Sequence, residues 1–203
     1  MSLILASASP RRADLLREAG FRFRVLPAAV EELPAVPGAA SGIALRNAER
    51  KADFVAAGHP EDTVIGADTV VELDGMILGK PADPGDALRI LMLLSGKRHN
   101  VLTGVCIRNT AQNVRIVFTD CTAVWFRPFD ADTAKLYISQ VEVMDKAGAY
   151  GIQERGDMLV ERIDGLFSNI VGLPVERVVE SLRSIGEIPG EAAIINEKER
   201  NNG

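Results

Sequence analysis

The sequence contains few of the residues from which thiolate and histidine sites are built. Its 203 residues include two histidines and two cysteines. Two histidines are too few for a histidine-rich zinc site, and Cys106 and Cys121 lack the spacing of metal ligands. His99, which opens a predicted strand, is expected to form a structural hydrogen bond rather than act as a base. Both cysteines lie in apolar segments, so we expect buried free thiols, which favours a cytoplasmic protein.

Excess positive charge and long apolar runs are also missing. The formal net charge of −5 argues against stable binding to nucleic acid or to an anionic membrane. No apolar run approaches the length of a membrane span, and the first residues lack the basic-then-apolar pattern of a signal peptide. The chain has no G-x-x-x-x-G-K-[ST] loop, no dinucleotide-binding glycine fingerprint and no G-x-S-x-G elbow. These absences argue against P-loop, dinucleotide-dependent and serine-hydrolase chemistry.

Strand and helix patterns alternate along the chain. Apolar runs and period-two alternation predict strands in residues 3–6, 21–27, 98–108, 114–127 and 158–165, and a hairpin in 63–81 that turns at Asp74-Gly75. Helical spacing predicts helices in residues 10–19, 41–58 (capped near Ser41), 83–96, 130–140 and 172–186. We therefore expect an α/β fold, with a mixed, twisted sheet flanked by helices, as one domain or as two small lobes that share the sheet.

Two arginines stand where the first predicted helix begins. Ser9 offers its hydroxyl as the N-cap and Pro10 suits the first helical position, which places Arg11 and Arg12 in the first turn. Positive charge at this end of a helix costs a few tenths to about 1 kcal/mol per residue. An anion bound by the guanidinium groups and the free helix N–H groups would explain the placement. The alternative is that the arginines reach solvent or an acidic neighbour, and this turn alone favours neither.

Four further charged residues stand at positions that favour chemistry on phosphates. Asp68 follows a buried apolar run, where an acid is either an exposed turn residue or a placed catalytic or metal ligand. Lys80 lies between a flexible glycine and a rigid proline, and its alternative is a solvated loop lysine. Glu32 follows a strand and Lys51 lies in the second predicted helix, although both positions are also typical of a solvated surface. Cations bind phosphates, whereas carboxylates hold a hard divalent metal and accept a proton from water. Together these residues favour hydrolysis of a phosphoanhydride.

Small residues crowd the segment "DKAGAYGIQ", residues 145–153, which ends in Gln153. Such a composition suits the close approach of backbone to a ligand. A flexible loop is the alternative interpretation.

Five segments in order resemble the motif set of the Maf family of nucleotide pyrophosphatases: "SASPRR", "GADTVVELDGMILGKP", "SGKRHNVLTGV", "DKAGAYGIQ" and "SNIVGLP". The resemblance extends over residues 3–186. It implies a mixed α/β fold related to that of inosine-triphosphate pyrophosphatases, with two lobes around a central cleft. It also implies hydrolysis of nucleoside triphosphates to a nucleoside monophosphate and pyrophosphate, with a divalent metal such as Mg²⁺ or Mn²⁺.

The resemblance further implies a role for each candidate residue. Asp68 would be the general base that activates water, and Glu32 would help it to hold the metal or to orient the water. The remaining residues would bind the substrate: Arg11, Lys51 and Lys80 at the phosphates, Ser7 and Ser9 along the phosphate loop, and Arg12, Thr69 and Gln153 near the base. Thr69 and the segment that ends in Gln153 resemble the branch of the family that acts on dTTP and UTP. A neutral amide both donates and accepts, so it suits the imide edge of uracil or thymine.

Two other functions stay open. One is the same chemistry on another base, such as that of 7-methyl-GTP, and the other is a non-catalytic regulator of septum formation. We expect residues 1–188 to form a single domain and residues 189–203 to form a flexible tail. The family resemblance makes a homodimer plausible.

Overall fold

The computed structural model describes residues 2–190, and one seven-stranded sheet runs through them. Along the sheet the strands follow the order β2, β1, β3, β5, β6, β7, and β4 pairs with β3 beside that path. The strands are β1 (Leu3–Leu5), β2 (Phe23–Val25), β3 (Thr63–Leu73), β4 (Met76–Leu78), β5 (Arg98–Asn109), β6 (Val114–Phe126) and β7 (Val160–Asp164). β1 is parallel to β2 and β3, and the other pairs are antiparallel, which confirms the expected mixed sheet.

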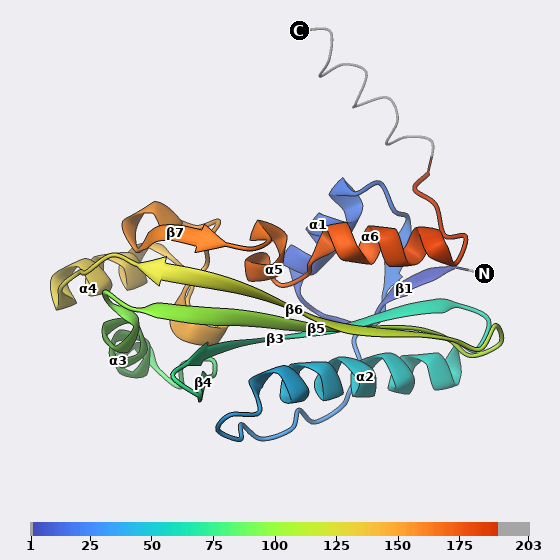
Figure 1. Ribbon diagram of the computed structural model, residues 1–203, viewed down its shortest axis with the longest axis horizontal. Coiled ribbons are helices and arrows are strands. Elements are labelled where there is room, and N and C mark those ends of the chain that lie inside the picture. Colours follow the sequence, from blue (N-terminus) through green and yellow to red (C-terminus); the bar gives the residue numbers. More distant parts are fainter. Residues whose placement is uncertain (1, 191–203) are drawn as a thin grey trace, which may run out of the picture.

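Helices flank both faces of this sheet (Figure 1). They are α1 (Pro10–Glu18), α2 (Ala40–Gly58), α3 (Pro84–Leu94), α4 (Ala131–Gln140), α5 (Phe167–Val171) and α6 (Val175–Ser184), with 3-10 turns η1 (Ala147–Ala149) and η2 (Gly156–Met158). In the view of Figure 1, α1, α5 and α6 lie above the sheet and α2 lies below it. The long strands β3, β5 and β6 connect these helices to α3 and α4 at the other end of the molecule.

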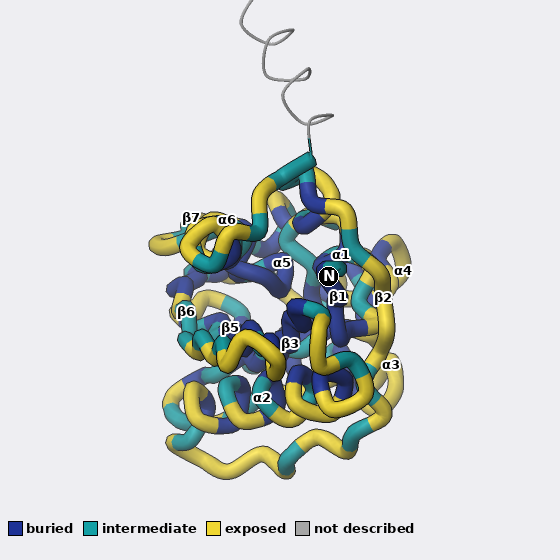
Figure 2. Tube along the Cα trace, turned by 90° about the vertical axis from the view of Figure 1, so that its right-hand side faces the viewer, coloured by how far each residue is buried: buried dark blue, intermediate teal, exposed yellow. Residues whose placement is uncertain are grey.

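The buried residues gather in the centre of the molecule, along β1, β3 and β5 (Figure 2). One apolar cluster joins Leu5 and Ile65 to α1 and α6, and another joins Val71 and Leu73 to α3 and α4. β3 contributes to both clusters. Asp68, in the middle of β3, therefore lies between two hydrophobic cores.

Strand β3 has a gap in its pairing where Asp68 lies. Residues 63–65 pair with β1 and residues 71–73 pair with β4. Both partners lie on the edge of β3 opposite β5, which pairs with residues 64–72. Within the part of the chain that the structure describes, residues 66–70 therefore have no strand partner on that edge. The gap leaves one edge of β3 open beside Asp68.

Glycines allow α2 to lie directly against the sheet. A Cβ atom on Gly66 of β3 would lie 2.2 Å from the carbonyl oxygen of Ala48, and one on Gly104 of β5 would lie 2.4 Å from the carbonyl carbon of Ala44. A larger residue at either position would require a backbone shift. Residues two apart in a strand share a face, so Asp68 lies on the same face of β3 as Gly66. The close contact brings Asp68 within reach of side chains on α2.

Some local predictions are wrong. Ser9 precedes α1 but its side chain makes no capping hydrogen bond, and α2 begins at Ala40, ahead of the predicted cap Ser41. Cys106 is buried as expected, but Cys121 is exposed. The hydroxyl of the next residue in β6, Thr122, donates to the carbonyl oxygen of Leu166, just before α5. Because side chains alternate between the two faces of a strand, Cys121 points to the opposite face. From residue 191 on, the predicted tail over 189–203 lies outside the described residues.

Candidate active site

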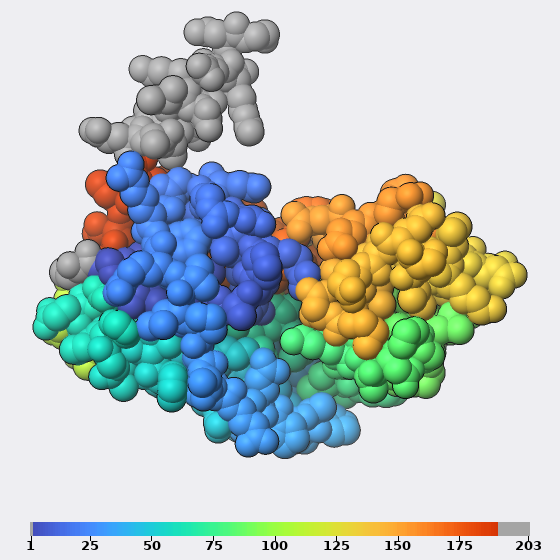
Figure 3. All heavy atoms as spheres, turned by 180° about the vertical axis from the view of Figure 1, so that it is seen from behind, coloured from blue at the N-terminus to red at the C-terminus, as the bar shows by residue number. Residues whose placement is uncertain are grey.

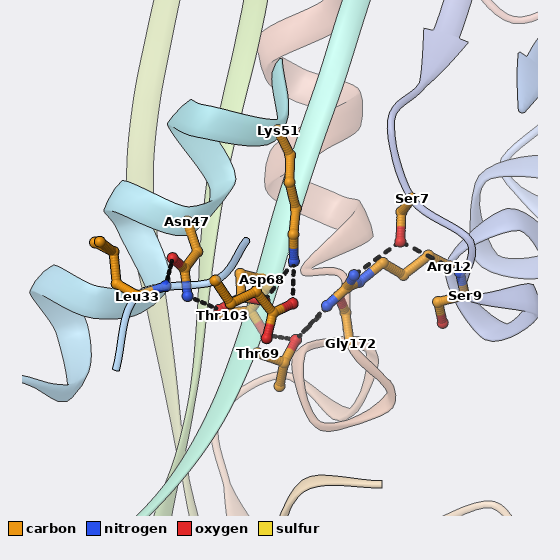
Figure 4. Close-up of polar contacts among 11 residues, drawn as sticks. Ser7, Ser9, Arg12, Leu33, Asn47, Lys51, Asp68, Thr69, Thr103 and Gly172 are labelled. Atoms are coloured by element: carbon orange, nitrogen blue, oxygen red, sulfur yellow. Dashed lines mark hydrogen bonds and ion pairs between the residues drawn. The ribbon is translucent and has the colours of Figure 1, made fainter. Parts of the chain in front are cut away.

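Asp68 has a hydrogen-bond donor on each of its carboxylate oxygens (Figure 4). The ammonium nitrogen of Lys51 lies 2.7 Å from Oδ1, and Nδ2 of Asn47 lies 3.0 Å from Oδ2. Lys51 and Asn47 are four residues apart on α2, so they lie on one face of that helix. Asp68 is only 6% exposed. An ammonium group and an amide thus fix the orientation of a nearly buried carboxylate.

Glu32 joins this group from the irregular segment between β2 and α2. Its Oε1 accepts a hydrogen bond from the same Lys51 nitrogen, over 2.7 Å. Burial acts to raise the pKa of Glu32, but the hydrogen bond and charge of Lys51, together with the charge of Lys80, outweigh that effect and hold the pKa below its ordinary value. One ammonium group therefore bridges two carboxylates.

Arg12 is buried on the other face of β3 and forms three hydrogen bonds. Its Nε donates to the Gly172 carbonyl oxygen over 2.7 Å, Nη1 to Ser7 Oγ over 2.8 Å and Nη2 to Thr69 Oγ1 over 2.9 Å. Burial lowers the pKa of the Arg12 guanidinium, although the carboxylates of the site oppose the effect. Arg12 thus connects the segment after β1, the middle of β3 and the residue that follows α5.

Arg11 points elsewhere and belongs to a chain of ion pairs. Its Nη1 lies 2.8 Å from Asp145 Oδ2, and Asp145 Oδ1 lies 2.9 Å from the ammonium nitrogen of Lys146. Lys146 is buried and also lies 3.0 Å from Glu154 Oε1. Burial acts to raise the pKa of Asp145, but hydrogen bonds from Lys146 and Arg11 hold it below its ordinary value. The sequence left open an acidic neighbour as the partner of the two arginines. For Arg11 that neighbour is Asp145.

One cavity of about 450 Å³ brings the candidate residues together. Its lining includes all of those that the sequence predicts except Ser7: Ser9, Arg11, Arg12, Glu32, Lys51, Asp68, Thr69, Lys80 and Gln153. Ser7 contacts Arg12 instead. In Figure 3 the blue N-terminal residues and the yellow and orange residues of the chain face each other across this side of the molecule. The cavity thus lies between segments that are far apart in the sequence.

Apolar side chains line the rest of the cavity. They include Val71, Leu78, Tyr150 and Ile170. Pockets of this size with an apolar wall and a few placed polar groups are typical of small-molecule sites. A ligand with both an anionic part and a flat, less polar part fits this lining.

The gap in β3 explains how consecutive residues reach the same cavity. Asp68 and Thr69 point to opposite faces of the sheet, Asp68 toward α2 and Thr69 toward Arg12. Both nevertheless line the cavity. The open edge of β3 lets one ligand reach side chains on either face of the strand.

Four charged or amide residues of the site escape prediction from the sequence: Asn47, Asp145, Lys146 and Glu154. Asn47 stands four residues before Lys51, and this helical spacing is the signal that could have found it. Asp145 and Lys146 belong to the segment noted for its small residues. Nothing in the sequence pairs Asp145 with Arg11, which is 134 residues away.

Glu32 and Asp68 are the residues that could hold a metal ion. Among residues 2–190, no group of three or more histidine, cysteine, aspartate and glutamate side chains is placed to do so. The two carboxylates do converge on one cationic group, that of Lys51. Proteins bind Mg²⁺ through one or two carboxylates together with substrate phosphates and water. The donor set therefore fits a hard divalent metal that is shared with a phosphorylated ligand.

The fold and the cavity together define an α/β protein with a small-molecule site that combines cations, two carboxylates and an apolar wall. The chain belongs to the Maf family, because the family model described as Maf-like protein matches residues 2–185. None of the helices in the described part of the chain is long and apolar enough to cross a membrane.

Curated relatives match most of the chain at 41–48% identity. A dTTP/UTP pyrophosphatase of Koribacter versatilis is 48% identical over 92% of this chain and 95% of that protein. A dTTP/UTP pyrophosphatase of Carboxydothermus hydrogenoformans is 42% identical over 92% of this chain and 100% of that protein. A solved HAM1 protein of Coxiella burnetii is 13% identical, with a TM-score of 0.48 over 90% of this chain and 98% of that chain. At that degree of similarity nothing about activity follows.

Proposed function

We propose that this protein hydrolyses nucleoside triphosphates, dTTP and UTP in particular, to the nucleoside monophosphate and pyrophosphate. The observation that carries the proposal is the position of Asp68, held between Lys51 and Asn47 in a cavity that also presents Arg11 and Lys80. The dTTP/UTP pyrophosphatases that match almost the whole chain support the choice of substrates.

In the proposed reaction, a water oxygen attacks the α-phosphorus and the bond from that phosphorus to the bridging oxygen breaks. Asp68 accepts the proton of the attacking water as general base. Each Asp68 oxygen has a further lone pair beside the hydrogen bond that it already accepts, so one oxygen is free to face the water. The pyrophosphate leaves with the bridging oxygen.

The cations of the cavity act on the phosphates. Arg11, Lys51 and Lys80 would bind phosphate oxygens and stabilise the charge that grows on the leaving pyrophosphate. Ser9, a cavity residue, would line the phosphate end next to α1, whereas Ser7 would act through Arg12, which donates a hydrogen bond to its hydroxyl. For Arg11 this requires that the phosphates replace Asp145 as its partner.

The base would lie near Arg12, Thr69 and Gln153. Gln153 is a cavity residue whose amide both donates and accepts, as the imide edge of a pyrimidine requires. Because three N–H groups of Arg12 already bond within the protein, we expect Arg12 to act mainly by fixing Thr69 and Gly172.

A divalent metal, Mg²⁺ or Mn²⁺, would be held by Glu32 and Asp68. When bound, it supplies positive charge that neutralises phosphate oxygens and makes a water easier to deprotonate. The convergence of both carboxylates on the Lys51 ammonium group supports this assignment, because the two side chains reach one cation together.

The test is pyrophosphate release by the purified protein on dTTP, UTP, CTP, GTP, 7-methyl-GTP and modified pyrimidine triphosphates. We expect turnover of dTTP and UTP with Mg²⁺ or Mn²⁺ and none with EDTA. Asp68→Asn should lower kcat by about a hundredfold or more, since general bases contribute that much, while the protein still binds nucleotide. Turnover of 7-methyl-GTP alone would contradict the roles of Thr69 and Gln153. A folded protein that binds nucleotides but hydrolyses none would favour a regulatory function.

Three further expectations complete the proposal. Residues 1–188 would form the unit that carries the activity, the protein would be a homodimer, and it would work in the cytoplasm. Analytical ultracentrifugation checks the homodimer directly. Activity of a chain truncated after residue 188 checks the extent of the unit.

A further inference from the structure

Asn47 uses both ends of its side-chain amide in the site. Its Nδ2 donates to Asp68 Oδ2 over 3.0 Å, and its Oδ1 accepts from the backbone N–H of Leu33 over 2.9 Å (Figure 4). Asn47 is 3% exposed. A buried amide with both ends bonded resists rotation, because any turn of the amide would leave a buried polar atom without a partner.

The Leu33 contact matters because of where Leu33 lies. Residues 26–39 form neither helix nor strand, and most of them are exposed. Glu32 lies in this segment, next to Leu33. The Glu32 side chain is 54% exposed, and its ion pair is with Lys51. The hydrogen bond from Leu33 to Asn47 therefore fixes the backbone that carries Glu32.

The Asp68 contact completes the connection. Lys51 bonds to Oδ1 and to Glu32, whereas Asn47 bonds to Oδ2 and to the backbone beside Glu32. Two side chains one turn apart on α2 therefore form parallel links between the same two acidic residues. Lys51 supplies the charged link and Asn47 the neutral one.

We infer that Asn47 is a positioning residue for the reaction: it sets the separation and orientation of the Asp68 and Glu32 carboxylates. This inference rests on the proposed function. Outer-shell residues that orient ligands or bases typically contribute about 10- to 100-fold to activity or metal affinity. Asn47 is expected to act in that range without touching the nucleotide.

The test compares three variants. Asn47→Ala removes both hydrogen bonds. Asn47→Asp keeps an acceptor for Leu33 but places a carboxylate against that of Asp68. Asn109→Ala is the matched control, because Asn109 is also buried and uses both ends of its amide, yet does not line the cavity.

At pH 8 we expect Asn47→Ala and Asn47→Asp to lower kcat about 10- to 100-fold, with the KM for dTTP changed less than about threefold. The Mn²⁺ concentration for half-maximal activity should rise in both. Asn109→Ala should leave kcat, KM and the Mn²⁺ concentration for half-maximal activity unchanged, even if its melting temperature falls as much as those of the two Asn47 variants. A kcat that falls no further in the two Asn47 variants than in Asn109→Ala would overturn the inference.

Hydrogen exchange tests the same residue without turnover, and so separates this inference from the proposed function. We expect faster exchange in residues 26–39 of Asn47→Ala, with exchange in α2 unchanged. Asn47→Asp should keep the protection near Leu33 while it loses kcat. Unchanged exchange in residues 26–39 of Asn47→Ala would show that Asn47 does not hold this segment, whether or not the protein proves to hydrolyse nucleotides.

Discussion

Lys51 and Lys80 are both cations of the cavity, yet their surroundings differ. Lys51 lies 2.7 Å from each of two carboxylates, and its loss would leave those carboxylates facing each other without a counter-charge. Lys80 has no carboxylate within ion-pair distance among the described residues. Lys80 is therefore the residue at which phosphate binding can be probed with little effect on folding.

Lys80→Met is expected to raise the KM for dTTP roughly 10- to 100-fold, because a charged hydrogen bond contributes about 1.5–3 kcal/mol. The melting temperature should change little. Steady-state kinetics and thermal unfolding measure the two quantities. Lys97→Met, which removes an exposed lysine outside the cavity, is the control for lost charge. Equal KM values in the two variants would remove Lys80 from the phosphate site.

His99 forms the structural hydrogen bond that the sequence predicts, with Nε2 2.9 Å from the Tyr150 hydroxyl. Its Nδ1 is buried without a hydrogen-bond partner. Burial lowers the pKa of His99 to about 4. The native state therefore keeps this histidine neutral at a pH where the unfolded chain, with an ordinary pKa near ~6.5, already binds a proton.

Stability should accordingly fall as the pH falls from about 6.5 toward 4, since the unfolded state binds the extra proton. The loss from one histidine is on the order of 3 kcal/mol over that range. Urea unfolding at several values between pH 5 and 7 measures the slope. His99→Gln should flatten it. An unchanged slope in His99→Gln would assign the pH dependence to other groups.

At the scale of elements, the contact between α2 and the sheet decides the geometry of the site. Gly66 and Gly104 allow this contact, and it brings Lys51 and Asn47 to Asp68. A methyl group between the helix and the strand would have to move backbone atoms on one side. Stability and catalysis should therefore both depend on these glycines.

Gly66→Ala is expected to destabilise the protein by about 1–3 kcal/mol or more and to lower kcat, because α2 must move away from β3. Chemical denaturation and steady-state kinetics check the two effects. Gly58→Ala is the matched control, because a Cβ at the end of α2 meets no atom within 4 Å. If Gly66→Ala were as stable and active as Gly58→Ala, the close packing would not be required.

The local elements follow the sequence closely where a cap or turn residue is specific. Asp83 and Asp130 cap α3 and α4 with their side chains, and the Asp74-Gly75 turn joins β3 to β4. The prediction fails where tertiary packing replaces the local signal. Neither α1 nor α2 has a side-chain cap, although α1 begins at Pro10 as predicted, and Arg11 and Arg12 find partners in distant segments, Asp145 and Gly172.

At the scale of the whole molecule, the cavity lies between segments that are far apart in the sequence. Residues of 26–39 and of 145–154 border it from different sides of β3. A bound nucleotide would contact both. Nucleotide binding in the cavity should therefore stabilise residues 26–39 and residues 145–154 together rather than one segment alone.

A UTP analogue that resists cleavage between the α- and β-phosphates is expected to stabilise the protein in the presence of Mg²⁺. At a ligand concentration one hundred times Kd the gain is about 2.7 kcal/mol. Thermal unfolding measures the gain, and hydrogen exchange should show protection both in residues 26–39 and in residues 142–158. Protection confined to one segment would place the ligand outside the shared cavity.

The sequence by itself determined the alternation of strands and helices, the hairpin that turns at Asp74-Gly75 and the family, because these depend on local periodicity, turn residues and ordered motifs. It also supplied most of the candidate residues. Only the tertiary structure decided that Arg11 pairs with Asp145, that Asn47 links Asp68 to the backbone beside Glu32, and that Cys121 is exposed. These contacts depend on which faces of distant elements meet. The gap in β3, which places Asp68 and Thr69 in one cavity, results from how three other strands pair with it, and no local pattern in β3 specifies that pairing.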